Sequence, residues 1–340
     1  MNYDWQTLWF ILVGVLFMGY AVLDGFDLGV GALHLLVKDD RERRLFLNAI
    51  GPIWDGNEVW LVTGGGALFA AFPEVYATVF SGFYLAFMLL LVALIFRAVA
   101  IEFRSKQSSP EWRNFWDISF SVSSILSGLL VGVAMGNIAW GIPIGADHEY
   151  AGDFLGLLKP FPLLLGVTTV SLFMMHGSIY LILKTEGGLQ EKLKGWVKNT
   201  MIFFILCYVL TTMVTLLFVP HMVETIKLYP VLVLVPFANV LFIANIPRSV
   251  AKNQVLGAFL SSCGAMVSLM ALFGIGMYPN MVFSNPLPQN SLTIYNAASS
   301  VKTLKIMSLI AAIGMPLVIG YTASIYWVFR GKVKLDSHSY

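Results

Sequence analysis

The chain has 340 residues, of which 58% are hydrophobic and only 12% are charged, and its mean hydropathy is +0.77. Soluble domains carry about 25% charged residues, so this composition excludes a soluble globular protein and indicates an integral membrane protein. The formal net charge of +2 is too small to indicate a nucleic-acid-binding protein. Long apolar runs without alternation exclude a transmembrane β-barrel and favour membrane-spanning helices.

Nine apolar segments are long enough to cross a bilayer, which takes about 20 residues. They cover residues 8–37, 46–71, 75–101, 115–138, 161–183, 201–219, 229–246, 255–278 and 304–329. No stretch between them could fold alone, so we predict one all-α membrane domain over residues 1–340. We expect spans one to four (8–138) and five to eight (161–278) to form two four-helix bundles, with the ninth span (304–329) at the periphery.

The lysines and arginines indicate the orientation of these spans. Four of the 21 basic residues fall in the connections of one side, namely Lys159, Lys227, Lys302 and Lys305. The others belong to the opposite side, around residues 38–44, 97–113, 184–198, 248–252 and 330–334. Because cytoplasmic connections are enriched in lysine and arginine, this asymmetry predicts an N-terminus outside and a C-terminus in the cytoplasm.

The second predicted span contains the stretch WDGNEVW, which runs from Trp54 to Trp60 and carries Asp55, Asn57 and Glu58. A carboxylate at the centre of a membrane helix costs about 2.5 to 3.5 kcal/mol on insertion scales, so such residues usually face a bundle interior or a water-filled path. Asp55 lies about nine residues, or roughly 14 Å, into the span, with Glu58 one turn deeper on about the same face. We expect the two tryptophans to pack around these acids.

The first predicted span carries a second acidic stretch, DGFDLGVG. Asp24 and Asp27 are three residues apart and therefore share one face of a helix, toward its cytoplasmic end. Gly25 and Gly29 form a G-x-x-x-G pattern, which is typical of closely packed membrane helices.

Together these acids predict a ladder of carboxylates that rises from the cytoplasmic surface, through Asp24 and Asp27, to Asp55 and Glu58 near the middle of the bilayer. Groups of this kind can take up and release protons, as a proton path requires. The alternative is that the acids are structural and pair, for example, with Arg97 or Asn57.

The five histidines are poorly placed for binding haem. His148 and His338 fall in an outside loop and the C-terminal tail, and His34 and His221 fall near span ends. Only His176 is deep in a span, whereas a bis-imidazole haem site needs two facing histidines. We therefore expect a neutral, hydrogen-bonded His176, and no haem or metal bound by this chain.

At WDGNEVWL the sequence resembles subunit II of the cytochrome bd-type quinol oxidases. Further motifs of that family follow in the expected order along the chain. They are DGFDLGVG (24–31), RERR (41–44), GGALFAAFP (65–73), SGFY (81–84), FRSK (103–106), WRNFWD (112–117) and LTIYNAASS (292–300). The resemblance covers essentially the whole chain and is densest in the first 120 residues.

The resemblance implies a heterodimer with a larger subunit I in the bacterial cytoplasmic membrane, and it leaves room for a small single-span third subunit. Subunit I would ligate two haems b and one haem d and bind quinol. The complex would oxidise quinol and reduce dioxygen to water electrogenically, with protons drawn from the cytoplasm. Subunit II would hold no haem and would be inactive alone.

The resemblance also implies roles for individual residues. Asp55 matches a membrane aspartate thought to feed protons toward the haems, and Asp24 and Asp27 match acidic positions at the cytoplasmic mouth of that path. Arg97 matches an arginine at the start of the cytoplasmic connection after the third span.

Two other functions compete with a proton-conducting subunit. The first is a purely structural subunit that assembles and stabilises subunit I. The second is a secondary transporter, which would need inverted repeats and interrupted helices near the midplane of the bilayer. The sequence has no evident matched pair of interrupted helices, which disfavours the transporter.

Overall fold

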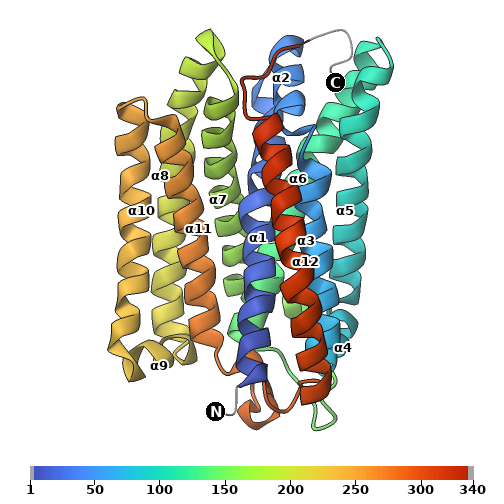
Figure 1. Cartoon of the computed structure of the whole chain (residues 1–340), viewed down its shortest axis with the longest axis vertical. Helices are drawn as coiled ribbons and strands as arrows, with labels where there is room; N and C mark the ends of the chain where they lie inside the picture. Colours follow the sequence, from blue (N-terminus) through green and yellow to red (C-terminus); the bar gives the residue numbers. More distant parts are fainter. Residues whose placement is uncertain (1–3, 336–340) are drawn as a thin grey trace.

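The computed structural model describes residues 4–335. The chain is a bundle of long helices with one small sheet at the end that holds the N-terminus (Figure 1). Its α-helices are α1 (Trp5–Leu33), α2 (Asp40–Ile50), α3 (Trp54–Ala71), α4 (Pro73–Gly82), α5 (Tyr84–Phe103), α6 (Pro110–Trp140), α7 (Pro160–Lys184), α8 (Gly187–Phe218), α9 (His221–Leu228), α10 (Leu234–Ala251), α11 (Val255–Met277) and α12 (Val301–Val328). Strands β1 (Asn280–Val282) and β2 (Leu292–Thr293) pair antiparallel.

Short 3-10 helices extend or connect several of these elements. They are His34–Leu36, Arg104–Lys106, Leu155–Leu157, Pro230–Val233 and Pro288–Asn290. With these extensions, eight of the described helical segments are long and apolar enough to cross a membrane: Trp5–Leu36, Tyr84–Lys106, Pro110–Trp140, Pro160–Lys184, Gly187–Phe218, Pro230–Ala251, Val255–Met277 and Val301–Val328. This confirms the membrane-spanning helical class.

The second predicted span is not one continuous helix. Residues 46–50 end the separate helix α2, residues 51–53 form a turn, and α3 begins only at Trp54. The charged segment that opens α2, capped by the Asp39 carboxylate at the Glu42 amide, is too polar for the hydrocarbon. Because α3 itself opens with Asp55, Asn57 and Glu58, it is not among the eight apolar helices, and the total of nine spans stays a prediction.

The third predicted span is also divided. Residues 75–82 belong to α4, and the chain breaks at Phe83 before α5 begins. Pro73 stands in the first turn of α4, where a missing amide hydrogen costs nothing. The apolar pattern runs through both helices, so hydrophobicity alone did not reveal the break.

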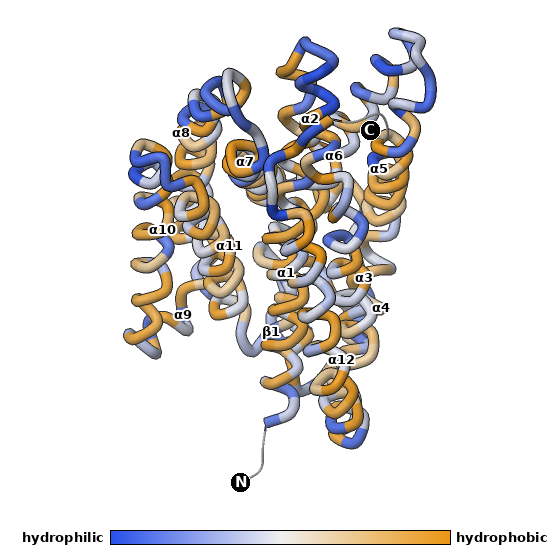
Figure 2. Tube along the Cα trace, turned by 45° about the horizontal axis from the view of Figure 1, so that its top comes forward, coloured by the Kyte–Doolittle hydropathy of each residue, from blue (hydrophilic) through white to orange (hydrophobic). Residues whose placement is uncertain are grey.

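The connections differ between the two ends of the bundle. Helix α2, the turn between α7 and α8, and the last described residues lie at one end, whereas the N-terminus and the small sheet lie at the other (Figure 1). Hydrophilic residues gather at the α2 end, and hydrophobic residues line the helices between (Figure 2). The basic connections therefore share one end, which the sequence predicts to be cytoplasmic.

Helix α1 is at the centre of the molecule and packs against α3, α6, α7 and α11. Helix α6 packs between α5 and α7, α7 also packs against α8, and α10 packs against α11. Since α7 contacts α1 and α6 as well as α8, the first and second halves of the chain share one interior, and their division into two bundles stays a prediction. Helix α12 contacts mainly α1 and α3 and buries little of its surface.

The closest approach in this interior is between α1 and α7. A β carbon placed on Gly29 would collide with the Phe173 carbonyl, and one placed on Gly177 would collide with the backbone of α1. Gly25 faces the Phe173 ring in the same way. These contacts confirm the close packing predicted from the G-x-x-x-G pattern of α1.

Gly29→Ala is expected to destabilise the protein by about 1 to 3 kcal/mol, because the added methyl group must push α7 away from α1. Gly14→Ala, on the same helix, is the matched control, since a β carbon there has no neighbour within 4 Å. Thermal unfolding of the purified complex measures both variants. Equal stabilities would contradict the backbone contact.

Candidate functional site

The guanidinium of Arg97 is fully buried and surrounded by three carboxylates. Its Nη2 lies 2.6 Å from Asp24 Oδ1, and its Nη1 lies 3.3 Å from Asp24 Oδ2, so this pair is bidentate. Nη1 also lies 3.4 Å from Glu58 Oε2, and Nη2 lies 4.0 Å from Asp27 Oδ2. We call Arg97, Asp24, Asp27, Glu58 and Asn57 the Arg97 cluster.

Asn57 joins this cluster to the last helix of the chain. Its Nδ2 donates to Asp27 Oδ2 at 2.7 Å and to the Leu23 carbonyl at 3.2 Å. The hydroxyl of Tyr326, on α12, donates to Asn57 Oδ1 at 2.8 Å. Sequence reasoning missed Tyr326, because it is one more aromatic residue in an apolar span and no local signal links it to Asn57.

The Arg97 cluster is buried but incompletely paired. Asp24, Asp27 and Arg97 are fully buried, whereas the Glu58 side chain is 21% exposed. Among the described residues, Asp27 Oδ1, Arg97 Nε and the nearby Tyr20 hydroxyl have no hydrogen-bond partner. Buried polar atoms in native proteins are nearly always paired with protein or water. These unpartnered atoms can therefore bind water, and the Asp27 oxygen can also bind a proton.

Asp55 does not stand where the ladder prediction put it. It lies in the first turn of α3, not nine residues into a span, because α2 and the turn take up the preceding residues. The contact of Asn57 with Asp27 places the start of α3 beside Asp27, so Asp55 is not deeper in the bundle than the two acids of α1. Its side chain is exposed, whereas that of Glu58 points toward Arg97.

Arg97 also differs from its expected position. It lies within α5, about two turns before the helix ends at Phe103, rather than in a cytoplasmic connection. The pairing of acids with Arg97 and Asn57, which the sequence offered as the structural alternative, is present in the structure. It engages Asp24 fully but leaves one oxygen of Asp27 without a protein partner.

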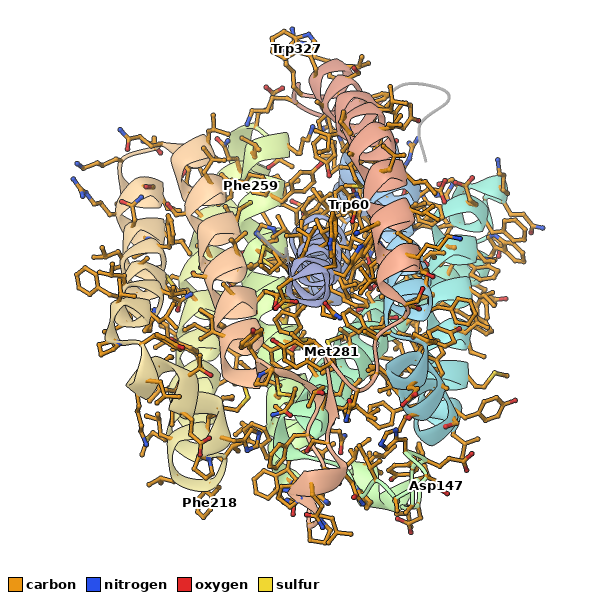
Figure 3. The ribbon with its side chains drawn as sticks, turned by 60° about the horizontal axis from the view of Figure 1, so that its bottom comes forward. Trp60, Asp147, Phe218, Phe259, Met281 and Trp327 are labelled. Atoms are coloured by element: carbon orange, nitrogen blue, oxygen red, sulfur yellow. The ribbon has the colours of Figure 1, made fainter. Side chains whose placement is uncertain are left out.

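The two tryptophans of WDGNEVW have different surroundings. The Trp54 ring centre lies 6.0 Å from Arg97 Cζ, within range of a cation–π interaction. Trp60 packs on Gly19 of α1, where any side chain would displace it. Figure 3 shows Trp60 beside α1, in contrast to Trp327, which projects from the far end of α12.

A second buried cluster lies near the α2 end of the bundle. The Asp117 carboxylate accepts from His34 Nε2 at 2.5 Å, Arg104 Nε at 2.6 Å and Arg43 Nη1 at 2.7 Å. Arg104 Nη2 further contacts Asp40 Oδ1 at 2.8 Å. We call these five residues the Asp117 cluster.

The Asp117 cluster ties together the end of α1, the start of α2, the end of α5 and the first turns of α6. Sequence reasoning did not single it out. The available signal was an acid, Asp117, near the start of an apolar span, with basic residues at two other span ends on the same predicted side. A buried carboxylate bonded to three cationic or imidazole groups makes the packing around it rigid, so we interpret the Asp117 cluster as structural.

Comparison with known proteins decides the family. A sequence model described as cytochrome bd terminal oxidase subunit II matches residues 5–329. The chain belongs to the cytochrome bd terminal oxidase subunit II family. This confirms the resemblance seen in the sequence motifs, and it makes the chain a subunit of a respiratory oxidoreductase.

Relatives of this subunit II match along nearly their whole length. It is 35% identical to cytochrome bd-I ubiquinol oxidase subunit 2 of Escherichia coli K12, over 96% of this chain and 95% of that protein. It is 36% identical to cytochrome bd ubiquinol oxidase subunit 2 of Bacillus subtilis 168, over 96% of each. The bd oxidase structure from Geobacillus thermodenitrificans contains a similar fold, with a TM-score of 0.79 at 15% identity over 96% of this chain and 98% of that one.

His176, the histidine deep in a span, does not fit the haems that the family name implies. His176 Nδ1 lies 2.7 Å from Ser262 Oγ, its Nε2 lies 3.0 Å from the Val22 carbonyl, and its ring stacks on Phe259. Both ring nitrogens are therefore engaged, as expected for a hydrogen-bonded histidine. His34 bonds Asp117 through Nε2, and aromatic rings flank it, whereas its buried Nδ1 has no hydrogen-bond partner among the described residues.

The remaining histidines are peripheral. His148 pairs with Glu74 at 2.7 Å, and His221 contacts the Ala139 carbonyl at 2.8 Å, where burial lowers its pKa. His338 lies outside the described residues. Within residues 4–335, no group of three or more histidine, cysteine, aspartate or glutamate side chains has the geometry of a metal site.

Proposed function

We propose that this subunit II conducts protons from the cytoplasm to an oxygen-reducing haem site in a partner subunit I, and that it also stabilises that subunit. The complex would be a heterodimer in the bacterial inner membrane that oxidises quinol and reduces dioxygen to water. Subunit I would ligate two haems b and one haem d. The observation that carries the proposal is the Arg97 cluster, a buried site with three carboxylates for one guanidinium.

The excess of carboxylates supports proton transfer. Full ionisation of the three acids would leave two uncompensated negative charges in a low-dielectric interior, so proton uptake brings the cluster closer to neutrality. Asp27 offers an oxygen without a protein partner, and Glu58 extends from the cluster to the surface of α3. A proton can therefore be accepted inside the bundle and passed on at its surface.

The exposed acid on α3 supports a partner on that face. Asp55 and the partly exposed Glu58 lie beside apolar residues such as Val59 and Val62, which are 51% and 71% exposed. Carboxylates that face hydrocarbon are costly, whereas a partner subunit can bind them or line a water path with them. We therefore assign Asp55 to the exit toward subunit I rather than to the middle of a ladder.

A purely structural subunit is the second candidate. The bidentate pair of Arg97 with Asp24 and the clamp around Asp117 favour it, because both hold helices together. The two candidates differ in what they predict for Asp27, which carries no salt bridge as short as that of Asp24.

Asp27→Asn is expected to lower oxygen consumption of the assembled complex by about tenfold or more, because an amide cannot take up the proton. Haem content should stay at the wild-type level, since Asn preserves shape and the Asn57 contact. Oxygen uptake with saturating quinol and the visible spectrum measure the two quantities. Asp55→Asn should act in the same direction.

The control is Asp147→Asn, an exposed acid at the opposite end of the bundle. Wild-type turnover of Asp27→Asn would contradict the proton path. Loss of haem or of the complex, with normal turnover per remaining haem, would favour the structural subunit.

A further inference from the structure

We infer that protons reach the Arg97 cluster through a cavity at the α2 end of the bundle, and that Tyr326 is the residue that positions water between this cavity and Asp27. The inference rests on the proposed proton-conducting function and adds the entrance to it. It assigns a role to the segment that follows α12, residues 329–334, which we call the C-terminal strap.

The cavity has a volume of about 400 Å³. Its walls are the end of α2 and the following turn, the end of α7, the last turn of α12 and the C-terminal strap. Asn48, Ile53, Tyr180 and Tyr326 are among the residues that line it. It therefore opens at the end of the molecule that gathers the basic connections.

Tyr326 connects this cavity to the acids. It lines the cavity, and its hydroxyl donates to Asn57 Oδ1 at 2.8 Å. Asn57 is 1% exposed and donates in turn to Asp27 Oδ2 at 2.7 Å. Two hydrogen bonds thus separate a wall of the cavity from a fully buried carboxylate.

The side chains of α1 around Asp27 are tightly packed. Phe26, Val30 and Leu33 of α1 are fully buried in the core beside the cluster. A second cavity of similar size, about 420 Å³, lies at the opposite end against Glu74 and His148. Glu58 and Asp55 open on the α3 face, which the proposed function gives to the partner subunit.

The C-terminal strap is fastened over the cavity by reciprocal contacts. The Lys332 ammonium bonds three backbone carbonyls at the end of α7, and the Val333 amide donates to the Lys184 carbonyl at 2.9 Å. Lys184 in return bonds the Phe329 carbonyl at the end of α12. Each ammonium thus stabilises a helix C-terminus. These contacts hold the strap in place over the cavity.

Proton transfer in this arrangement needs no change at Tyr326 itself. Asp27 does not itself line the cavity, so a hydronium ion there passes its proton to the water beside Tyr326, and that water passes a proton to Asp27 Oδ1, which has no protein partner. Asp27 becomes a carboxylic acid, and both waters are left neutral. Asn57, an amide, does not carry the proton but holds the other oxygen of Asp27. The Tyr326 hydroxyl fixes Asn57 and orients the last water, which makes it a positioning residue.

Tyr326→Phe in the assembled complex tests this role. Turnover with saturating quinol is expected to fall about two- to tenfold, the effect of losing one net hydrogen bond. The KM for quinol should not change, the solvent deuterium isotope effect should rise, and turnover should recover as the pH is lowered. A tyrosine with only a packing role would produce neither the isotope effect nor the recovery.

Tyr180→Phe is the matched comparison. Tyr180 lies in the wall of the same cavity, but its hydroxyl donates to the Ala49 carbonyl at 2.9 Å rather than to the cluster. We expect a smaller loss of turnover than for Tyr326→Phe and no change in the isotope effect. Equal effects in the two variants would overturn the assignment of Tyr326.

Blocking the cavity provides an independent test. Gly331 lines it on the strap and has open space around its β position, so Gly331→Cys should assemble normally. Modification of that thiol with a bulky methanethiosulfonate reagent is expected to lower turnover severalfold. Ala77→Cys, modified in the cavity at the opposite end, is the control.

The outcomes separate this inference from the proposed function. If Asp27→Asn is slow while Tyr326→Phe and the modified Gly331→Cys turn over normally, the proton path exists but its entrance lies elsewhere. If all three have wild-type turnover, both the path and its entrance are wrong.

Discussion

Arg97→Met is expected to prevent recovery of the intact oxidase complex, or to lower its stability by about 3 to 5 kcal/mol, the cost of breaking a buried ion pair. The variant removes the one guanidinium that faces Asp24, Asp27 and Glu58. Carboxylates left without a cation must either stay charged in a low-dielectric interior or bind protons permanently. Yield of haem-containing complex and its thermal unfolding measure the loss.

A charge-balanced variant separates electrostatics from packing. In Arg97→Met combined with Asp24→Asn, the cluster loses one negative charge along with the positive one, so assembly should recover in part. Arg97→Lys should fall between wild type and Arg97→Met, because an ammonium keeps the charge but cannot reproduce the bidentate pair with Asp24. Wild-type stability of Arg97→Met would show that the three acids are already neutral and need no cation.

Asp117→Asn is expected to lower the stability of the complex by about 3 to 5 kcal/mol, because one buried carboxylate serves His34, Arg43 and Arg104. An amide can accept from one of these groups but cannot compensate their charge. The guanidinium of Arg104 is only 2% exposed, so water cannot replace the lost partner. Thermal unfolding of the purified complex, followed by haem absorbance, measures the effect.

Substitutions in the Asp117 cluster and in the Arg97 cluster should have different effects on turnover. Within residues 4–335, no hydrogen bond or salt bridge joins the side chains of the Asp117 cluster to the acids of the proposed path, so the Asp117→Asn complexes that survive purification should turn over at the wild-type rate per haem. Glu111→Gln is the matched control, an exposed acid in the first turn of the same helix. A slow but stable Asp117→Asn complex would instead place this cluster on the proton path.

Much of this protein can be read from its sequence because membrane insertion acts on local composition. Apolar runs of sufficient length identify most of the membrane-crossing segments, and the uneven distribution of lysine and arginine predicts their direction. The cost of an intramembrane carboxylate marks Asp24, Asp27 and Glu58 as residues to explain, whatever their partners. The spacing of Gly25 and Gly29 likewise indicates a helix contact without naming the other helix.

Only the tertiary structure decided which residues meet. Arg97 and Asp24 are 73 positions apart, and Tyr326 and Asn57 are 269 positions apart, so neither pair leaves a local pattern. Asp55 lies at the surface rather than in the predicted interior, because a turn at residues 51–53 separates α2 from α3. The apolar pattern continues through this turn and therefore did not reveal it. Composition selects the segments that enter the membrane, but the rotation of each helix about its axis is determined by packing against its neighbours. Because of these rotations, Asp24, Asp27 and Glu58 surround Arg97 instead of forming the predicted ladder.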